Sequence, residues 1–339
     1  VRNDTQVDPE NPERPFSQRQ LVECLRQGAE RFGWSKRNPT PGQTREGEWL
    51  IGMGCATSTY PYNRMPGGAA RITLTRDGHA RVEIAAHEMG MGTATAQTQV
   101  TAERLGLELD QVTVAYGDSA MPGHVLAGGS QQTAAIGAAV AAAHQVLVTE
   151  LLKLAGEGSP LAGLKATEVG GLNGGLASLE RPERHESYQS LLARAQRDQL
   201  VAEASAPPPM ESMHWSIHSH GAMFCEVRVN AVTGEPRVSR VLGSFDCGRI
   251  LNPKAARNQI IGAMTMGVGG ALMEHLAVDK RLGFFVNHDL AGYEVPVHAD
   301  IPHQEVIFLD ETDPISSPMK AKGVGELGIC GPGAAVANA

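Results

Sequence analysis

The chain has 339 residues, 42% of them hydrophobic, so it is long enough to bury a large core and to form two or more compact parts. Its formal net charge of -8 provides no basic surface for a phosphate backbone, and we expect no membrane-spanning segment. The composition therefore argues against nucleic acid and membrane partners.

The predicted elements begin with an amphipathic helix over residues 17–32, with Ser17 as its N-cap. Alternating runs on both sides of Asp77 and Gly78 predict a β-hairpin, followed by a helix over 94–107 and a strand over 111–118. The same order returns later, where strands over 223–230 and 236–245 precede a long helix that begins near Lys254.

This recurrence predicts an α+β fold with two related β-hairpin/helix units, whose mixed sheets are packed by helices. We expect a helical lead-in over 1–48, a first unit over 49–156, an insert and linker over 157–205, and a second unit over 206–339.

The cysteines are an odd number, so they cannot all pair within the chain, and none forms a C-x-x-C motif. A structural zinc site or an iron-sulfur cluster needs several closely placed thiolates. We therefore expect free thiols at Cys24, Cys55, Cys225, Cys247 and Cys330. The polar N-terminal residues 1–15 have no apolar core, so no signal peptide is expected there.

Three glycine-rich segments stand at predicted helix starts: HEMGMGT (87–93), AGGSQQT (127–133) and GICGPG (328–333). Each offers backbone N–H groups to an anion or a polar heterocycle, although a tight turn with an N-cap explains any one of them alone. The three together, with Gln131, Gln132 and Gln259, favour a large ligand rich in hydrogen-bonding groups. No segment fits a Rossmann or P-loop nucleotide motif.

Three other groups of residues carry polar side chains that suggest a specific role. His214, His218 and His220 share one face of a predicted strand and are either metal ligands or part of a half-buried face. His87 and Glu88 form either an acid-base pair or turn and cap hydrogen bonds. Asp246 and Asn252 set a turn and cap the following helix.

The segments KGVGELG, EMGMGT, GGSQQT, FDCGRILNP and ARNQIIGAMTMGVG resemble the molybdenum-cofactor-binding large subunit of the xanthine dehydrogenase and aldehyde oxidase family. The N-terminal RNDTQVDPENPERPFS and LVECLRQGAERFGW are similar to the bacterial periplasmic aldehyde oxidoreductase branch. The resemblance covers nearly the entire chain, and it implies that both units are of the molybdenum-cofactor-binding domain type.

By this resemblance Glu326 is the general base beside the molybdenum, with oxygen derived from water and two electrons leaving through the metal. No protein side chain is implied as a metal ligand. The cofactor is expected to be molybdopterin, in the cytosine dinucleotide form of the bacterial branch, which the sequence itself does not distinguish from the mononucleotide. The resemblance places its contacts at Met91, Gly92, Thr93, Gly129, Ser130, Gln131, Gln132, Thr133, Gln259 and Gly325. Many family members have Gln at the position of Met91, so one amide contact differs here.

The family subunit is longer, so the chain is expected to be its C-terminal portion, inactive alone and completed by the N-terminal part. The expected substrate is an aldehyde, or an N-heterocycle that becomes hydroxylated, and the expected electron acceptors are partner subunits with iron-sulfur clusters and FAD. The alternative is a non-catalytic assembly module of the same fold, without cofactor. Localisation stays open between bacterial cytoplasm and periplasm.

Overall fold

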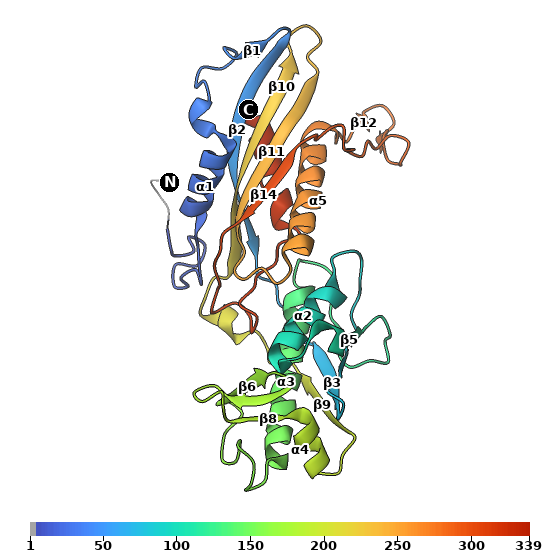
Figure 1. The fold of residues 1–339 in the computed structure, drawn as a ribbon. Coiled ribbons are helices and arrows are strands. Elements are labelled where there is room, and N and C mark those ends of the chain that lie inside the picture. Colours follow the sequence, from blue (N-terminus) through green and yellow to red (C-terminus); the bar gives the residue numbers. More distant parts are fainter. Residues whose placement is uncertain (1–4) are drawn as a thin grey trace. The chain divides into compact units, whose positions relative to one another are not determined.

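The computed structural model describes residues 5–339 (Figure 1). The chain forms two compact units that are discontinuous in sequence. Unit 1 comprises residues 1–62, 215–313 and 322–339, and unit 2 comprises 63–214 and 314–321. The sequence suggested consecutive ranges instead, and their assignment as cofactor-binding halves stays a prediction. Each unit is described by itself.

Unit 1 is built on a sheet with strand order β1-β2-β10-β11-β14. Its strands are β1 (Arg45–Glu46), β2 (Trp49–Pro61), β10 (His218–Asn230), β11 (Pro236–Asp246) and β14 (Gln304–Phe308), with a separate pair β12 (Val278–Asp279) and β13 (Phe284–Phe285). Its helices are α1 (Leu21–Phe32), α5 (Pro253–Leu272) and α6 (Pro332–Ala337), with 3-10 turns η1 (Trp34–Lys36) and η4 (Leu327–Ile329).

Alternation along β10 explains the two helical layers of unit 1. Met223 and Cys225 pack in one apolar cluster with Ile260 and Met264 of α5, whereas Phe224 packs in another with residues of α1. Successive side chains of a strand point to opposite faces. The sheet is therefore covered by α1 on one side and by α5 and α6 on the other (Figure 1).

Unit 2 contains a sheet with order β5-β4-β3-β9 and a smaller sheet β6-β7-β8. Its strands are β3 (Ala69–Thr75), β4 (Ala80–Glu83), β5 (Val112–Ala115), β6 (Val169–Leu172), β7 (Gly175–Ser178), β8 (His185–Ser187) and β9 (Gln199–Ser205). Its helices are α2 (Thr93–Leu105), α3 (Gln132–Leu154) and α4 (Tyr188–Arg194), with 3-10 turns η2 (Leu109–Gln111) and η3 (Met210–Met213).

Both large sheets share one pairing scheme, which confirms the prediction of an α+β fold with related hairpin/helix units. In unit 1 the β10–β11 hairpin is followed by α5 and by β14, which pairs parallel to β11. In unit 2 the β3–β4 hairpin is followed by α2 and by β5, which pairs parallel to β4. A fourth strand, β2 or β9, pairs antiparallel to the first strand of each hairpin. A parallel pair needs such a helical crossover.

The start of α1 differs from the prediction. The helix begins at Leu21 and its N-cap residue is Gln20, so Ser17 is not the cap. Instead the carboxylate of Asp246, at the end of β11, accepts a 2.8 Å hydrogen bond from the Gln20 backbone N–H. Asp246 was expected to cap the following helix, but Asn252 alone caps α5, by accepting from Ala255 N. The carboxylate that accepts a hydrogen bond at the start of α1 therefore comes from a distant part of the sequence.

Helix α3 corrects the expectation that no segment is apolar enough to span a membrane. The most apolar stretch of α3 has a mean hydropathy of 1.6. Among the described residues, α3 is the one helix that is long and apolar enough to cross a bilayer. However, 56% of that window is buried, and Ile136, Val140 and Leu147 lie in the core of unit 2. The core helix of a soluble protein can have the same length and apolar composition, so these two properties are weak evidence that α3 spans a membrane.

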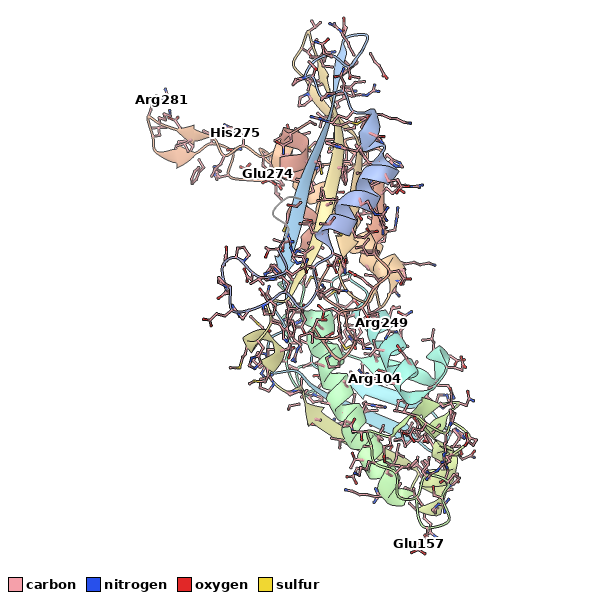
Figure 2. The ribbon with its side chains drawn as sticks, turned by 90° about the vertical axis from the view of Figure 1, so that its left-hand side faces the viewer. Arg104, Glu157, Arg249, Glu274, His275 and Arg281 are labelled. Carbon is pink, nitrogen blue, oxygen red and sulfur yellow. The ribbon has the colours of Figure 1, made fainter. Side chains whose placement is uncertain are left out.

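The segment between α5 and β14 includes an extended arm that carries β12 and β13 (Figure 2). Glu274 and His275 lie at its base and Arg281 near its tip, close to the β12–β13 pair. The arm carries several exposed apolar side chains, including Leu282, which is 70% exposed, and Leu290, which is 87% exposed.

Candidate cofactor-binding and catalytic site

The predicted site residues divide between the two units. Gln259, Gly325 and Glu326 belong to unit 1. The remaining ones belong to unit 2, where they lie in two glycine-rich loops at the starts of α2 and α3: Met91, Gly92, Thr93, Gly129, Ser130, Gln131, Gln132 and Thr133.

Gln132 joins the two loops of unit 2. Its Nε2 donates to the backbone carbonyl of His87 at 2.7 Å and to Thr93 Oγ1 at 3.0 Å, and its Oε1 accepts from His87 N at 3.3 Å. A second bridge runs from Gln97 Nε2 on α2 to the Thr133 carbonyl at 3.1 Å. Gln97, Thr93 and Gln132 are all buried. The structure thus brings the predicted residues of the two loops together.

Glu88 organises the loop that precedes α2. Its Oε1 accepts hydrogen bonds from Gly90 N at 2.9 Å and from Gly92 N at 3.0 Å. Burial by itself raises the pKa of Glu88, but backbone N–H groups of Gly92, Gly90, Thr93 and Ala94 together lower this pKa below its ordinary value. This confirms the reading of Glu88 as a turn and cap residue. Gly90 (φ 101°) and Gly92 (φ 79°) supply the positive φ angles that the loop requires.

The loop before α3 contains two consecutive residues in the left-handed region, Gly129 at φ 68° and Ser130 at φ 52°. A serine with positive φ is uncommon and persists only where its surroundings hold it. Gln131 contributes to this, because its Oε1 accepts from Met65 N at 3.2 Å and its Nε2 donates to the Leu126 carbonyl at 2.6 Å. The side chains of Gln131 and Gln132 therefore shape the loops.

In unit 1, Glu326 is half-buried and immediately precedes η4. The thiol of Cys330 lies one turn later, and its Sγ contacts the Glu326 carbonyl oxygen at 3.4 Å. Burial, and to a lesser degree the negative charge of Glu326, raises the pKa of this thiol. Cys330 is exposed, unlike Cys24, Cys225 and Cys247, and all five cysteines are free as expected.

Gly328 places the Glu326 segment directly against α5. A Cβ at Gly328 would lie 2.8 Å from Ala263 Cβ and 3.0 Å from the Ile260 carbonyl oxygen, closer than side chains normally approach. Ile260 is the neighbour of the half-buried Gln259. The structure therefore brings the segments of Gln259 and Glu326 together within unit 1.

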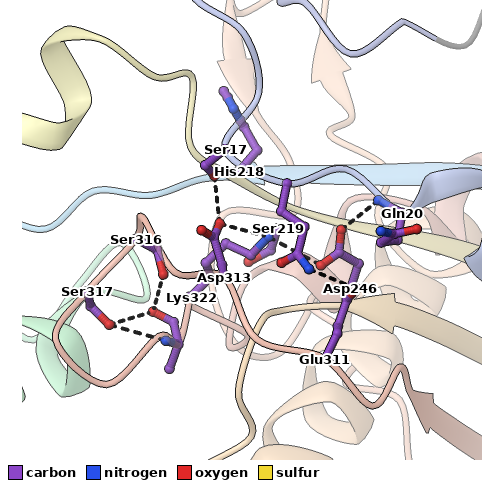
Figure 3. A network of polar contacts seen from close by, with 12 residues as sticks. Ser17, Gln20, His218, Ser219, Asp246, Glu311, Asp313, Ser316, Ser317 and Lys322 are labelled. Atoms are coloured by element: carbon purple, nitrogen blue, oxygen red, sulfur yellow. Dashed lines mark hydrogen bonds and ion pairs between the residues drawn. The ribbon is translucent and has the colours of Figure 1, made fainter.

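A buried ionic cluster beside this segment was missed in the sequence. Lys322 Nζ lies 3.2 Å from Asp246 Oδ1 and 3.5 Å from Asp313 Oδ2 (Figure 3). Burial and a hydrogen bond with Asp246 raise the pKa of Glu311 to about 9, so this side chain holds a proton at neutral pH. The cluster joins Asp246, at the end of β11, to three residues in the range 311–322. Its one signal in the sequence is the lysine that directly precedes the glycine-rich loop.

The three histidines do not share one strand face. His214 lies before β10, which begins at His218. The rings of His218 and His220 pack edge-on against Phe16 at centroid distances of 5.7 and 5.3 Å. Burial, followed by the charge of Lys322, lowers the pKa of His220 to about 3. Among residues 5–339 no group of three or more His, Cys, Asp or Glu side chains is arranged to hold a metal ion.

The donors present in unit 2 fit a cofactor that carries phosphate. Successive backbone N–H groups around left-handed residues form concavities that bind anions, and the positive ends of α2 and α3 favour negative charge. Gly129 and Ser130 provide such a turn next to the start of α3, whereas next to α2 the backbone N–H groups of Gly90 and Gly92 donate to the Glu88 carboxylate.

Comparison with known proteins agrees with this geometry. A family model for the molybdopterin cofactor-binding domain matches residues 27–302. The chain is 49% identical over 342 residues to the aldehyde oxidoreductase molybdenum-binding subunit PaoC of Escherichia coli K12, covering all of this chain and 44% of that subunit. It is 30% identical over 337 residues to the putative xanthine dehydrogenase molybdenum-binding subunit XdhA of the same organism, covering 94% of this chain and 43% of XdhA.

A solved structure shows the same fold. Reconstituted CO dehydrogenase from Oligotropha carboxidovorans superimposes with a TM-score of 0.80 at 20% identity, over 98% of this chain and 44% of that one. The chain thus spans less than half the length of the relatives it matches. Because the family model covers well over half of it, the chain belongs to the molybdopterin cofactor-binding domain family. The resemblance to molybdenum-binding subunits of xanthine dehydrogenases and aldehyde oxidoreductases is confirmed.

Proposed function

We propose that this chain is the C-terminal portion of the catalytic subunit of a molybdenum hydroxylase that oxidises an aldehyde to a carboxylic acid. The main support is the 49% identity with an aldehyde oxidoreductase molybdenum-binding subunit over the full chain. Within that portion, Glu326 is the general base. It is the acid of the glycine-rich segment that packs against α5, where the Gly328 contact leaves no room for a side chain.

The loops at Met91–Thr93 and Gly129–Thr133 are the proposed molybdopterin contacts of unit 2, and Gln259 is the proposed contact of unit 1. When bound, this cofactor supplies the molybdenum that accepts two electrons from the substrate. The cytosine dinucleotide form is part of this proposal, as are partner subunits that carry iron-sulfur clusters and FAD.

The proposed role of Glu326 is to accept a proton on its carboxylate. A general base takes a proton from a reacting oxygen in the transition state and contributes about 10²–10⁴-fold to the rate. Half-burial of Glu326 shields it in part from bulk water, while the adjacent glycines allow a reacting group to approach the backbone closely. The source of the transferred oxygen is water.

The experiment uses the complete subunit with its partner chains. Metal analysis and release of a fluorescent pterin establish the cofactor, and turnover of an aldehyde and of a purine with an artificial electron acceptor establishes the substrate class. Aldehyde turnover with bound molybdenum supports the proposal. Turnover of the purine without turnover of the aldehyde would show that the substrate is an N-heterocycle. A complete assembly without molybdenum and pterin contradicts the enzyme assignment and favours a non-catalytic module.

A further inference from the structure

Lys322 is a buried cation at the start of the segment that ends in Glu326 (Figure 3). Its side chain and those of Asp246 and Asp313 are fully shielded from solvent. A buried ion pair is weak evidence for stability, because apolar side chains of similar volume often stabilise a protein more. Stability alone therefore does not account for a lysine at this position, and its geometry has to be considered.

The two carboxylates are held by a distant part of unit 1. Asp246 Oδ2 accepts from Gln20 N at 2.8 Å, and Asp313 Oδ2 accepts from Ser17 Oγ at 2.6 Å. The first contact fixes Asp246 to the start of α1, and the second fixes Asp313 to the residues before that helix. Lys322 therefore pairs with two acids, Asp246 at the end of β11 and Asp313, that hydrogen bonds hold to the start of α1 and to the residues before it.

The backbone around Lys322 is also held. Lys322 N donates to the Cys247 carbonyl at 2.9 Å, and the Gly323 carbonyl accepts from Ser219 Oγ at 2.7 Å. After Glu326, the fully buried Leu327 and the close contact of Gly328 with α5 fix the chain again.

Between these two anchors lie Val324, Gly325 and Glu326. Val324 packs against an apolar cluster of unit 1, and Gly325, as a glycine, restricts the backbone least. The direction in which this segment leaves its first anchor therefore depends on how firmly that anchor is held.

We propose that Lys322 is a positioning residue for Glu326. Its ammonium draws the Asp246 and Asp313 carboxylates together and fixes the start of the loop, so that Glu326 is held in one orientation. The inference rests on the proposed role of Glu326 as general base, and Lys322 acts through the loop. If the ammonium is removed, two buried carboxylates lose their counter-charge and the first anchor shifts. A displacement of about 1 Å at a reacting group costs about 10²-fold in rate.

The experiment uses the complete subunit with its partner chains and compares Lys322→Met with wild type. We expect kcat to fall about 10²-fold, with KM and molybdenum content changed less than about twofold. Amide hydrogen exchange over residues 323–327 is expected to become faster. Lys322→Arg keeps the charge and is expected to recover kcat to within about tenfold of wild type.

A double variant separates positioning from simple charge balance. Lys322→Met with Asp246→Asn restores the balance of charge, so we expect thermal stability to recover while kcat and exchange protection stay low. Arg240→Met is the control for loss of an ion pair on the same sheet, because it breaks the partly exposed Arg240–Glu226 pair of 2.9 Å and the bond from Arg240 to the Phe32 carbonyl. This control is expected to lower stability while kcat and exchange over 323–327 stay unchanged.

The proposal is overturned if Lys322→Met keeps kcat within about threefold of wild type while Glu326→Gln is inactive, or if the double variant regains kcat together with stability. If Lys322→Met does not fold, Lys322→Arg and the double variant decide the question by the same criteria. If Glu326→Gln itself stays active, the proposed function fails, and exchange over 323–327 still reports whether Lys322 holds the loop.

Discussion

Gln132 Nε2 donates to Thr93 Oγ1 over 3.0 Å, and this bond ties the start of α3 to the start of α2. The same amide also bonds the backbone of His87 through both its nitrogen and its oxygen. One buried side chain therefore sets the spacing of the two glycine-rich loops that we propose as the cofactor cradle.

Gln132→Ala removes this bridge. We expect the free energy of unfolding of the chain to fall by about 1–3 kcal/mol, because the backbone groups of His87 lose their partner, and cofactor content of the complete subunit to fall. Chemical denaturation and metal analysis measure the two effects. Gln145→Ala, on the exposed side of the same helix, is the control and should change neither. Unchanged cofactor content in Gln132→Ala would contradict the placement of the cradle.

Glu88→Gln tests the acid that holds the loop before α2. The folded-state pKa of Glu88 is lowered from its ordinary value of 4.5, so its charge stabilises the fold above pH 4.5, and this contribution is lost as pH falls through the lower folded pKa. We expect wild type to be about 1–2 kcal/mol more stable than Glu88→Gln at pH 7. The difference should shrink as the pH is lowered to about 3. A difference that stays constant with pH would show that charge is not the cause.

Gly328→Ala tests the contact that places the Glu326 segment on α5. The added Cβ would lie 2.8 Å from Ala263 Cβ, so η4 has to move. We expect a loss of about 1–3 kcal/mol in stability and at least about a tenfold loss in kcat of the complete subunit. Gly333→Ala is the matched control in the neighbouring α6, where the new Cβ meets nothing within 4 Å. Equal behaviour of the two variants would remove the argument for close packing.

The thiol of Cys330 reports on Glu326 in the chain alone. Because the charge of Glu326 contributes to the raised pKa of Cys330, Glu326→Gln should lower that pKa and increase thiolate at a fixed pH. We expect faster alkylation of Cys330 by iodoacetamide at pH 8 in this variant. Cys55, whose pKa is raised to about 11 by burial alone, serves as the internal control. An unchanged ratio of the two rates would place the carboxylate away from Cys330.

Local signals in the sequence predicted much of the fold. The Asp77–Gly78 turn marks the β3–β4 hairpin, and Asn252 with Pro253 marks the start of α5, because turn and cap preferences act over a few residues. Strand β14 was not predicted, since its parallel pairing with β11 joins residues about sixty positions apart in sequence, as in Val241 with Gln304. No local pattern encodes such a pairing.

The candidate site likewise combines features with local sequence signals and contacts between residues that are distant in sequence. The glycine-rich loops and Glu326 were found from motifs. The ion pair of Lys322 with Asp246 was not predicted, because only the folded β11 brings Asp246 close to Lys322. The bond from the Gln20 N–H to Asp246 at the start of α1 was not predicted for the same reason. Likewise, the bonds of Gln131 to Met65 and Leu126 could not be read from the AGGSQQT motif, which suggested an amide directed at the cofactor.

The most direct test of the central claim is the turnover of Glu326→Gln in the complete subunit, with molybdenum and pterin content measured on the same sample. We expect cofactor content equal to wild type and a loss in kcat of at least about 10²–10⁴-fold, because the substitution removes the base and leaves the fold. Turnover equal to wild type at equal cofactor content would show that Glu326 is not the base.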